Sequence, residues 1–383
     1  MRDGSDLWSI ASRRMSSSLL WSEPLSEPED VVRWFGAAQA QDYEPAKWGI
    51  AMRTTSAGNS DLDRLIDEGH ILRTHALRPT WHFVSPADIR WLQALTGPRV
   101  HVLNGHHYRL QGLDRELLAR CERLIVRWLE GEGDLTRKEI GDRLSAEGIE
   151  AKGSRLAYIM MSAELNGVLC SGERRGATHT YALISRRAPE ALELTEDQAL
   201  RELIVRYFQS HGPATVGDFR WWSSLTVAQI RRGIELAGDR LRAEKMGDDA
   251  LWSVGSAHRS RPAHPTVHLL QAYDEYTVAF ADTKNAVDAD GIATRPSVID
   301  GRAFYNALIV DGQLAGWWRR SLSRHQIVLE VRPSRRLSAH ERESLHAAAE
   351  RYGRFHDLPV RVAELGESDR FGRGQVSRFG RSG

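Results

Sequence analysis

The feature that most constrains this 383-residue chain is a run of two capped helices and two short strands near its middle. Thr136 is a good cap for the first helix, and Ser154 for a second helix that ends at Gly167. Two short apolar segments follow, VLCSG and RRGATHTYALI, around a tip rich in Gly and Arg. A packed helix is expected just before the run, between Leu113 and Glu130. Helix, turn, helix and hairpin in this order predict a winged helix-turn-helix.

A weaker copy of the same pattern follows along the chain. Residues 200–211 form an amphipathic pattern, Thr215 begins the short helix TVGDFRWW, and Thr226 opens another helix. Repetition of one supersecondary unit predicts a tandem array of such motifs.

The N-terminal region is expected to be mainly helical. Residues 29–40, EDVVRWFGAAQA, have helical spacing, and we expect this helix to fray near Asp42 because Pro45 follows. A second helix is expected over residues 61–69, and residues 70–84 alternate well enough to form one or two strands.

Beyond Pro265 the patterns favour β-structure. The segments TVHLLQAYDEYTVAF, AFYNALIVDG, QLAGWWRR and HQIVLEVRP are expected to be strands, with Asp311-Gly312 as a hairpin turn. A helix from Ser338 to Tyr352 should pack on them. We therefore predict an α+β fold with a C-terminal β-rich region. The expected divisions are 1–112 (helical or winged-helix), 113–190 (winged helix-turn-helix), 191–262 (second helix-turn-helix), 263–366 (β-rich with a helix) and 367–383 (disordered Arg/Gly tail).

Charge and composition narrow the classes of protein without choosing one. The formal net charge of +1 gives no global attraction to nucleic acid, so any DNA-binding face must be a local concentration of Arg. Cys121 and Cys170 match no metal or redox spacing, and we expect neither metal nor cofactor. No apolar run is long enough to span a membrane and the start lacks a signal-peptide pattern, which predicts a cytoplasmic protein without membrane contact.

Several segments together resemble the winged-helix proteins that include the AlkZ-type DNA glycosylases. They extend from about Val31 to Arg320, and they are QAQDYEPAKWG, LRTHALRPTWHFV, SRLAYIMMSAELNGVLCSGERRGATHTYAL, GPATVGDFRWWSSLT, LLQAYDEY and DGQLAGWWRR. The AlkZ branch is similar in carrying Gln, an apolar residue and Gln, which Gln39, Ala40 and Gln41 match. The YcaQ branch has Asp at the second polar position, so Gln41 argues against that branch.

The resemblance implies a fold, an activity and a partner. It implies tandem winged helices in a C-shaped arrangement around double-stranded DNA. The implied activity is excision of N3- or N7-alkylated purines, including bulky adducts or interstrand crosslinks, without a metal and without a lyase step. It also assigns catalysis to Gln39 and Gln41.

The chemistry of the amide pair restricts both substrate and geometry. A purine alkylated at N7 or N3 is already cationic and leaves without a strong acid, so two neutral amides that position a water can suffice. Residues two apart share one side of an extended segment but not of a helix, so the helix must end by about Gln39. The alternative is that both glutamines are surface or helix-end residues bonded to backbone.

Two other segments contain further residues that are candidates for a substrate pocket. His75, Trp81 and His82 could stack or contact phosphate, although Trp81 and His82 face opposite ways on a strand and burial in the core is the alternative for either. Asp274 and Glu275 could stabilise a sugar cation electrostatically, or could be a strand-end pair bonded to backbone or Arg.

DNA contacts are expected from basic residues near the predicted motifs, with solvated surface charge as the alternative for each. The candidates are Arg73, Arg78, Arg155, Arg174, Arg175, His179, Arg231 and Arg232, and Arg370, Arg373, Arg378 and Arg381 in the tail could add non-specific affinity.

Two other functions compete with a glycosylase. A transcriptional regulator also uses winged helices, but it normally has one per chain and dimerises, whereas several copies in one chain suit a monomer that wraps a lesion. A small-molecule hydrolase lacks support because the chain has no Gly-x-Ser-x-Gly elbow and no phosphate-binding Gly loop.

Overall fold

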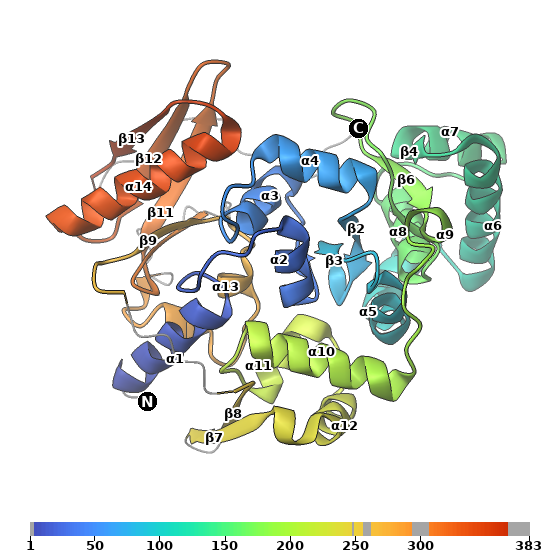
Figure 1. Cartoon of the computed structure of the whole chain (residues 1–383). Helices are drawn as coiled ribbons and strands as arrows, with labels where there is room; N and C mark the ends of the chain where they lie inside the picture. Colours follow the sequence, from blue (N-terminus) through green and yellow to red (C-terminus); the bar gives the residue numbers. More distant parts are fainter. Residues whose placement is uncertain (1–3, 247–248, 256–261, 293–305, 367–383) are drawn as a thin grey trace.

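The computed structural model describes residues 4–246, 249–255, 262–292 and 306–366, and combines helices with small β-sheets (Figure 1). The tail arginines from Arg370 to Arg381 lie outside the described residues. No helix in the described ranges is both long and apolar enough to cross a membrane. The helices and sheets together confirm the predicted mixture of helical and β-structure.

The N-terminal region brings a short strand to the Gln-x-Gln segment. Its elements are α1 (Gly4–Ser17), α2 (Pro28–Phe35), β1 (Ala38–Gln39), α3 (Tyr43–Ala51), α4 (Asn59–Glu68), β2 (Leu72–Ala76) and β3 (Arg78–Val84). The predicted helix over 29–40 is confirmed as far as Phe35 and was wrong beyond it, because Gly36 adopts a positive φ of 76° and ends the helix. Ala38 and Gln39 then pair with Phe83 and His82 on β3. Pro45 lies in the first turn of α3, where it starts a helix rather than fraying one.

The middle of the chain confirms the predicted helix and strand order. Its elements are α5 (Ile89–Leu110), α6 (Arg115–Glu132), β4 (Leu135–Thr136), α7 (Arg137–Ala146), α8 (Gly153–Leu165), β5 (Leu169–Ser171), β6 (Thr180–Leu183) and α9 (Ile184–Arg187). Thr136 caps α7 in a capping box with Glu139, and the strands form a sheet in the order β4-β6-β5. The prediction that Ser154 caps α8 was wrong, because the helix begins at Gly153 and its N-cap is Lys152.

The second predicted repeat has the same order of elements. It contains α10 (Glu196–Ser210), α11 (Val216–Ser223), α12 (Val227–Ala237), the 3₁₀ turn η1 (Gly238–Arg240) and the hairpin β7 (Arg242–Met246) and β8 (Asp249–Ser253). Thr215 and Thr226 cap their helices as predicted, each through a capping box. The hairpin was not predicted from sequence.

The C-terminal region forms a sheet covered by one helix. Its elements are β9 (Val267–Leu270), α13 (Glu275–Val278), the 3₁₀ turn η2 (Lys284–Val287), β10 (Asn306–Val310), β11 (Gln313–Leu322), β12 (Ile327–Pro333), α14 (Ala339–His356) and β13 (Val360–Glu364). The sheet order is β13-β12-β11-β10-β9. The turn at Asp311-Gly312 is confirmed, with φ of 49° and 83°. The expected strand over TVHLLQAYDEYTVAF was wrong beyond Leu270, because the chain turns there and Asp274 caps α13.

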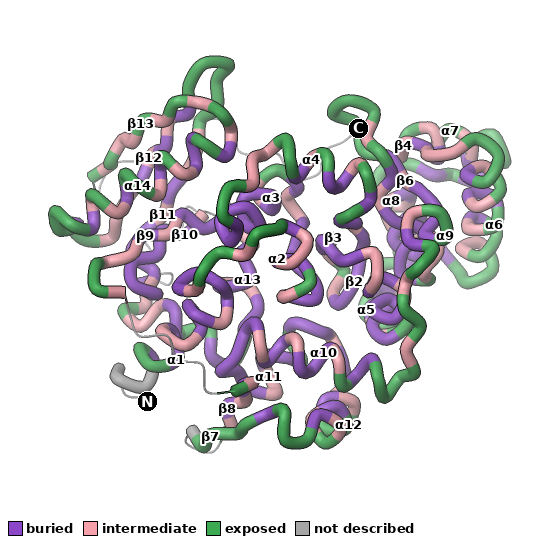
Figure 2. The backbone as a smooth tube through the Cα atoms, viewed as in Figure 1, coloured by how far each residue is buried: buried purple, intermediate pink, exposed green. Residues whose placement is uncertain are grey.

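The Gln-x-Gln segment lies where two hydrophobic cores meet. One core joins the N-terminal helices to the C-terminal sheet, and it includes Ala38 and Ala40. A second core joins β2, β3 and α5 to α10 and α12, and it includes Ala37. Figure 2 shows buried backbone concentrated around α3, β3 and α10, while β7 is exposed. Residues before and after Gln39 are therefore fixed by packing on both sides.

The contact between α5 and α8 gives a stability prediction. A Cβ on Gly97 would lie 2.4 Å from the carbonyl oxygen of Leu165, whereas a Cβ on Gly131 would meet nothing within 4 Å. We expect Gly97→Ala to lower the free energy of unfolding by roughly 1–3 kcal/mol through overpacking. The control, Gly131→Ala on α6, should raise it by roughly 0.5–1 kcal/mol, because alanine favours helix more than glycine does. Urea unfolding measures both, and unchanged stability of Gly97→Ala would contradict the close approach of the two helices.

Candidate active site

Gln39 lies in the wall of a cavity of about 1340 Å³ that is formed by distant parts of the chain. Arg78 and Thr80 of β3 line it next to Gln39. Residues of α5, α11 and the segment after β9 form further walls, and apolar side chains of β10 and β11, including Ile309 and Trp317, line another part. The cavity therefore combines a polar wall with an apolar one, as ligand sites commonly do.

The two glutamines meet the geometric condition that the sequence set. The helix before the segment has ended at Phe35, Gln39 belongs to β1, and Gln41 lies in the bend that follows the strand. The Arg78 guanidinium donates to Oε1 of Gln39 at 2.8 Å, and the backbone N–H of Trp81 donates to Oε1 of Gln41 at 3.3 Å. Within the part of the chain that the structure describes, the Nε2 amino groups of both glutamines donate to no residue. Both amides are thus oriented through their oxygens.

The backbone of the segment is also held by named partners. The backbone N–H of Ala40 donates to the carbonyl of Trp81 at 2.7 Å, and Nε of Arg73 donates to the carbonyl of Ala40 at 3.0 Å. Arg73 lies over the Trp81 ring, 4.4 Å from its centroid. Arg73 is thus hydrogen-bonded to the Gln-x-Gln backbone in this structure, and its predicted contact with DNA stays a prediction.

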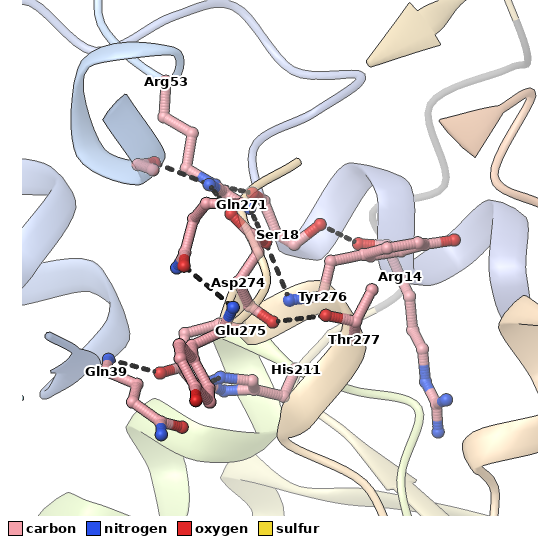
Figure 3. Close-up of polar contacts among 12 residues, drawn as sticks. Arg14, Ser18, Gln39, Arg53, His211, Gln271, Asp274, Glu275, Tyr276 and Thr277 are labelled. Carbon is pink, nitrogen blue, oxygen red and sulfur yellow. Dashed lines mark hydrogen bonds and ion pairs between the residues drawn. The ribbon is translucent and has the colours of Figure 1, made fainter. Parts of the chain in front are cut away.

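Glu275 is the buried group beneath Gln39 (Figure 3). Its carboxylate accepts from the backbone N–H of Gln39 at 2.6 Å, from Nε2 of His211 at 3.2 Å and from Nε1 of Trp222 at 2.9 Å. Burial raises the pKa of this carboxyl, but the hydrogen bond from His211 and nearby positive charges outweigh burial and lower the pKa to about 2. Glu275 is therefore an ionised structural acceptor at neutral pH.

Asp274, the preceding residue, is bound separately. Both of its carboxylate oxygens accept from the Arg53 guanidinium, at 2.9 and 2.7 Å, and one also accepts from the backbone N–H of Tyr276. The pair lies at the start of a short helix and not inside a strand, so the expected strand context was wrong. The backbone and Arg contacts of the alternative interpretation are present for Asp274.

The histidine and tryptophan candidates pack beside the glutamines. His75 is buried, bonds through Nδ1 to Glu164, and has its ring centroid 4.4 Å from that of Trp81. His82 is fully buried and donates through Nδ1 to the carbonyl of Thr80, and burial with the nearby Arg78 charge lowers its pKa to about 3. His82 is therefore neutral, and its unprotonated Nε2 has no hydrogen-bond partner among the residues that the structure describes.

Arg78, like Arg73, is hydrogen-bonded to the Gln-x-Gln segment, and the six other predicted DNA-binding residues fall into two groups. Arg155 donates to the carbonyl of Gln111, and Arg174 pairs with Asp63 and Asp67 while its side chain is only 13% exposed. The others lie at the surface: Arg175 paired with Glu139, His179 against Tyr43, Arg232 paired with Asp197, and Arg231. Their contact with DNA stays a prediction.

Sequence reasoning missed the residues that complete the site. His211 and Trp222 hold Glu275, and Arg99, Arg220 and Trp221 line the cavity. The doublet Trp221-Trp222 in the second repeat was the available signal, since two adjacent residues of one helix cannot both face the same core. Among the described residues, no cluster of three His, Cys, Asp or Glu side chains is arranged to hold a metal ion.

Comparisons with known proteins agree with this architecture. The family model for AlkZ-like DNA glycosylases matches residues 32–355. An interstrand DNA cross-link repair glycosylase of Streptomyces sahachiroi is 25% identical over 358 residues, which cover 89% of this chain and 95% of that protein. The solved structure of the Streptomyces sahachiroi DNA glycosylase AlkZ superposes with a TM-score of 0.76 at 22% identity, covering 95% of this chain and 100% of that one. The chain belongs to the AlkZ-like DNA glycosylase family, and it is a DNA glycosylase.

The three hydrogen bonds to Glu275 give a prediction for stability and its pH dependence. Glu275→Gln replaces one acceptor oxygen by an amino group, which faces donors, so we expect the free energy of unfolding at pH 7 to fall by roughly 3–5 kcal/mol. Because the folded pKa, about 2, is below the ordinary value of 4.5, the stabilisation is present above about pH 4.5 and is lost as pH falls towards 2.

Urea unfolding of both proteins at several pH values between 7 and 3 tests this. The matched control is Glu68→Gln, whose exposed partner Arg64 should make it cost less than about 1 kcal/mol. An equal difference between wild type and Glu275→Gln at pH 7 and pH 3 would contradict an ionised Glu275.

Proposed function

We propose that this glycosylase hydrolyses the N-glycosidic bond of cationic purines alkylated at N7 or N3, with Gln39 and Gln41 as its catalytic pair. The observation that carries the proposal is that hydrogen bonds orient both amides, at and just after the short strand β1, with Gln39 in the cavity wall. The neighbouring carboxylate, Glu275, already accepts three hydrogen bonds and is buried. The amides are therefore the groups available for chemistry.

The amide pair can assist a reaction whose leaving group needs no protonation. The bond between C1′ and the base nitrogen breaks, the electron pair neutralises the cationic purine, and positive charge moves to the sugar. Each amide oxygen has a second lone pair besides the one that Arg78 or the Trp81 N–H uses, so each can accept from a water. The amino groups can donate to sugar or phosphate oxygens. Water then adds to C1′ and its proton passes to solvent, which requires no lyase step.

Bulky adducts and interstrand crosslinks belong to the proposed substrate range. The cavity volume, about 1340 Å³, exceeds what a single purine requires, and pockets for drug-sized ligands are generally about 300–1000 Å³. The relative from Streptomyces sahachiroi is a cross-link repair glycosylase by name. The space beside Gln39 is therefore large enough for a purine that carries a group larger than methyl.

For DNA binding we propose that the two helix-turn-helix units act as tandem winged helices in a C-shaped monomer. Two helices followed by two paired strands occur in each unit, which supports this proposal. They are α7, α8, β5 and β6 in one unit, and α11, α12, β7 and β8 in the other. The regional divisions at 112, 190, 262 and 366 follow these units and stay a proposal. A DNA substrate also suits the cytoplasmic location that the sequence predicts.

Removing either amide should slow base excision strongly and leave DNA binding unchanged. We expect Gln39→Ala and Gln41→Ala each to lower the single-turnover rate on duplex DNA containing N7-methylguanine by about 10²-fold or more, as loss of a positioned polar group does in other active sites. Alkaline cleavage of the abasic product measures the rate, and fluorescence polarisation measures binding. Gln209→Ala, which removes a half-buried glutamine of α10, is the matched control and should keep wild-type activity.

The same assay separates the enzyme from a regulator. Wild-type protein that binds undamaged duplex tightly but releases no base would contradict the proposed reaction and favour a non-enzymatic DNA-binding protein.

The charge of the leaving base should decide which lesions are removed. Uracil is a neutral base, so its departure requires assistance that amides do not give. We expect release of uracil to be slower than release of N7-methylguanine by at least about 10²-fold under the same single-turnover conditions. Comparable rates on the two duplexes would contradict the mechanism.

A further inference from the structure

Trp221 is an exposed aromatic side chain on the rim of the cavity. Its side chain is 52% exposed, whereas the adjacent Trp222 is completely buried. A single exposed hydrophobic side chain is ordinary on a protein surface, so the meaning of Trp221 depends on where it lies. Trp221 lines the same cavity as Gln39.

The indole of Trp221 is fixed in place despite its exposure. Its Nε1 donates at 3.0 Å to the backbone carbonyl of Val278, the last residue of the short helix α13. The Arg78 guanidinium carbon lies 5.8 Å from the Trp221 ring centroid, and the same guanidinium donates to Gln39. One residue thus contacts both the exposed ring and the amide assigned to catalysis.

We propose that Trp221 is the stacking platform for the damaged purine and that its ring selects positively charged bases. A cation over the face of an indole is attracted by the ring quadrupole, and a flat purine also stacks on it. The inference rests on the proposed function, because it assumes that the substrate base is cationic and lies near Gln39.

The position of the charge during the reaction predicts which kinetic step Trp221 affects. The alkylated purine is cationic when it binds, but it becomes neutral as the bond breaks and the charge moves to the sugar. The attraction to Trp221 is therefore stronger in the bound substrate than in the transition state. An interaction of this kind tightens binding without accelerating bond cleavage. It also weakens when the neutral base is formed, which favours product release.

Single-turnover kinetics on duplex DNA with one N7-methylguanine test the platform. For Trp221→Leu we expect the enzyme concentration for half-maximal rate to rise about 3- to 30-fold, the range that the energy of a cation–π contact allows. The maximal rate should stay the same or rise by up to about 3-fold, since the contact is weaker in the transition state than in the bound substrate. Trp221→Phe should lie between wild type and Trp221→Leu, because phenylalanine keeps a weaker quadrupole. Gln39→Ala should show the opposite pattern, with a reduced maximal rate.

The neighbouring tryptophan provides a matched control. Trp222→Phe removes the Nε1 donor to Glu275, so it should lower stability and maximal rate rather than the affinity for the lesion. Thermal unfolding checks that Trp221→Leu, whose ring is half exposed, keeps wild-type stability.

Binding to undamaged duplex distinguishes a base platform from a general DNA contact. Trp221→Leu should bind undamaged duplex as wild type does, and equal losses on damaged and undamaged DNA would overturn the platform. An unchanged half-maximal concentration for Trp221→Leu would also overturn the platform. In that case, excision of N7-methylguanine by the wild type would still support the proposed function. Wild-type protein that releases no N7-methylguanine would overturn the proposed function itself.

Discussion

The hydrogen bond from the backbone of Gln39 to the buried carboxylate of Glu275 is the interaction on which the geometry of the site depends. Moving a charge out of water costs several kcal/mol, and the cost is offset only when every oxygen is well bonded. Here the donors come from β1, from His211 after α10 and from Trp222 of α11. A single acceptor therefore joins segments more than 200 residues apart in sequence and fixes the wall of the cavity only when all of them are folded.

Asp274, the acid next to Glu275, is also a buried carboxylate that joins distant segments. Asp274 binds the Arg53 guanidinium with both oxygens, and Arg53 also donates to the carbonyls of Ser18 and Gly49. Consecutive residues at the start of α13 thus fix the end of α3 and the strand that carries Gln39. Asp274 is the extended N-cap of α13 and Glu275 is its first helical residue, and the two side chains bind different partners.

The sequence predicted the structural features that depend on neighbouring residues, above all where helices begin. The caps Thr136, Thr215, Thr226 and Ser338 begin their helices as expected, because a cap and its partner lie three residues apart. The pairing of β1 with β3, the β7–β8 hairpin and the turn before α13 escaped prediction, because tertiary packing outweighs weak local preference in such short elements. The Gln-x-Gln pair was found by resemblance to a family. Its support by Glu275, 236 residues away, could not be inferred from either segment alone.

The electrostatics of the cavity wall explain how an arginine can lie beside a site for cationic bases. An isolated Arg78 charge next to Gln39 would oppose both a cationic purine and the sugar cation that follows. Glu275 is close enough to raise the pKa of Arg78, against the larger effect of burial, and Arg78 in turn helps to keep Glu275 ionised. The Glu275 charge offsets part of the Arg78 charge, so the guanidinium can orient the Gln39 amide at a lower electrostatic cost to a cationic base. Arg99, Arg220 and Lys284 also line the cavity, together with Asp282 and Asp288. Oriented amides suit a substrate that brings its own positive charge, and the proposed stacking on the exposed ring of Trp221 attracts such a base without placing a further carboxylate beside Gln39.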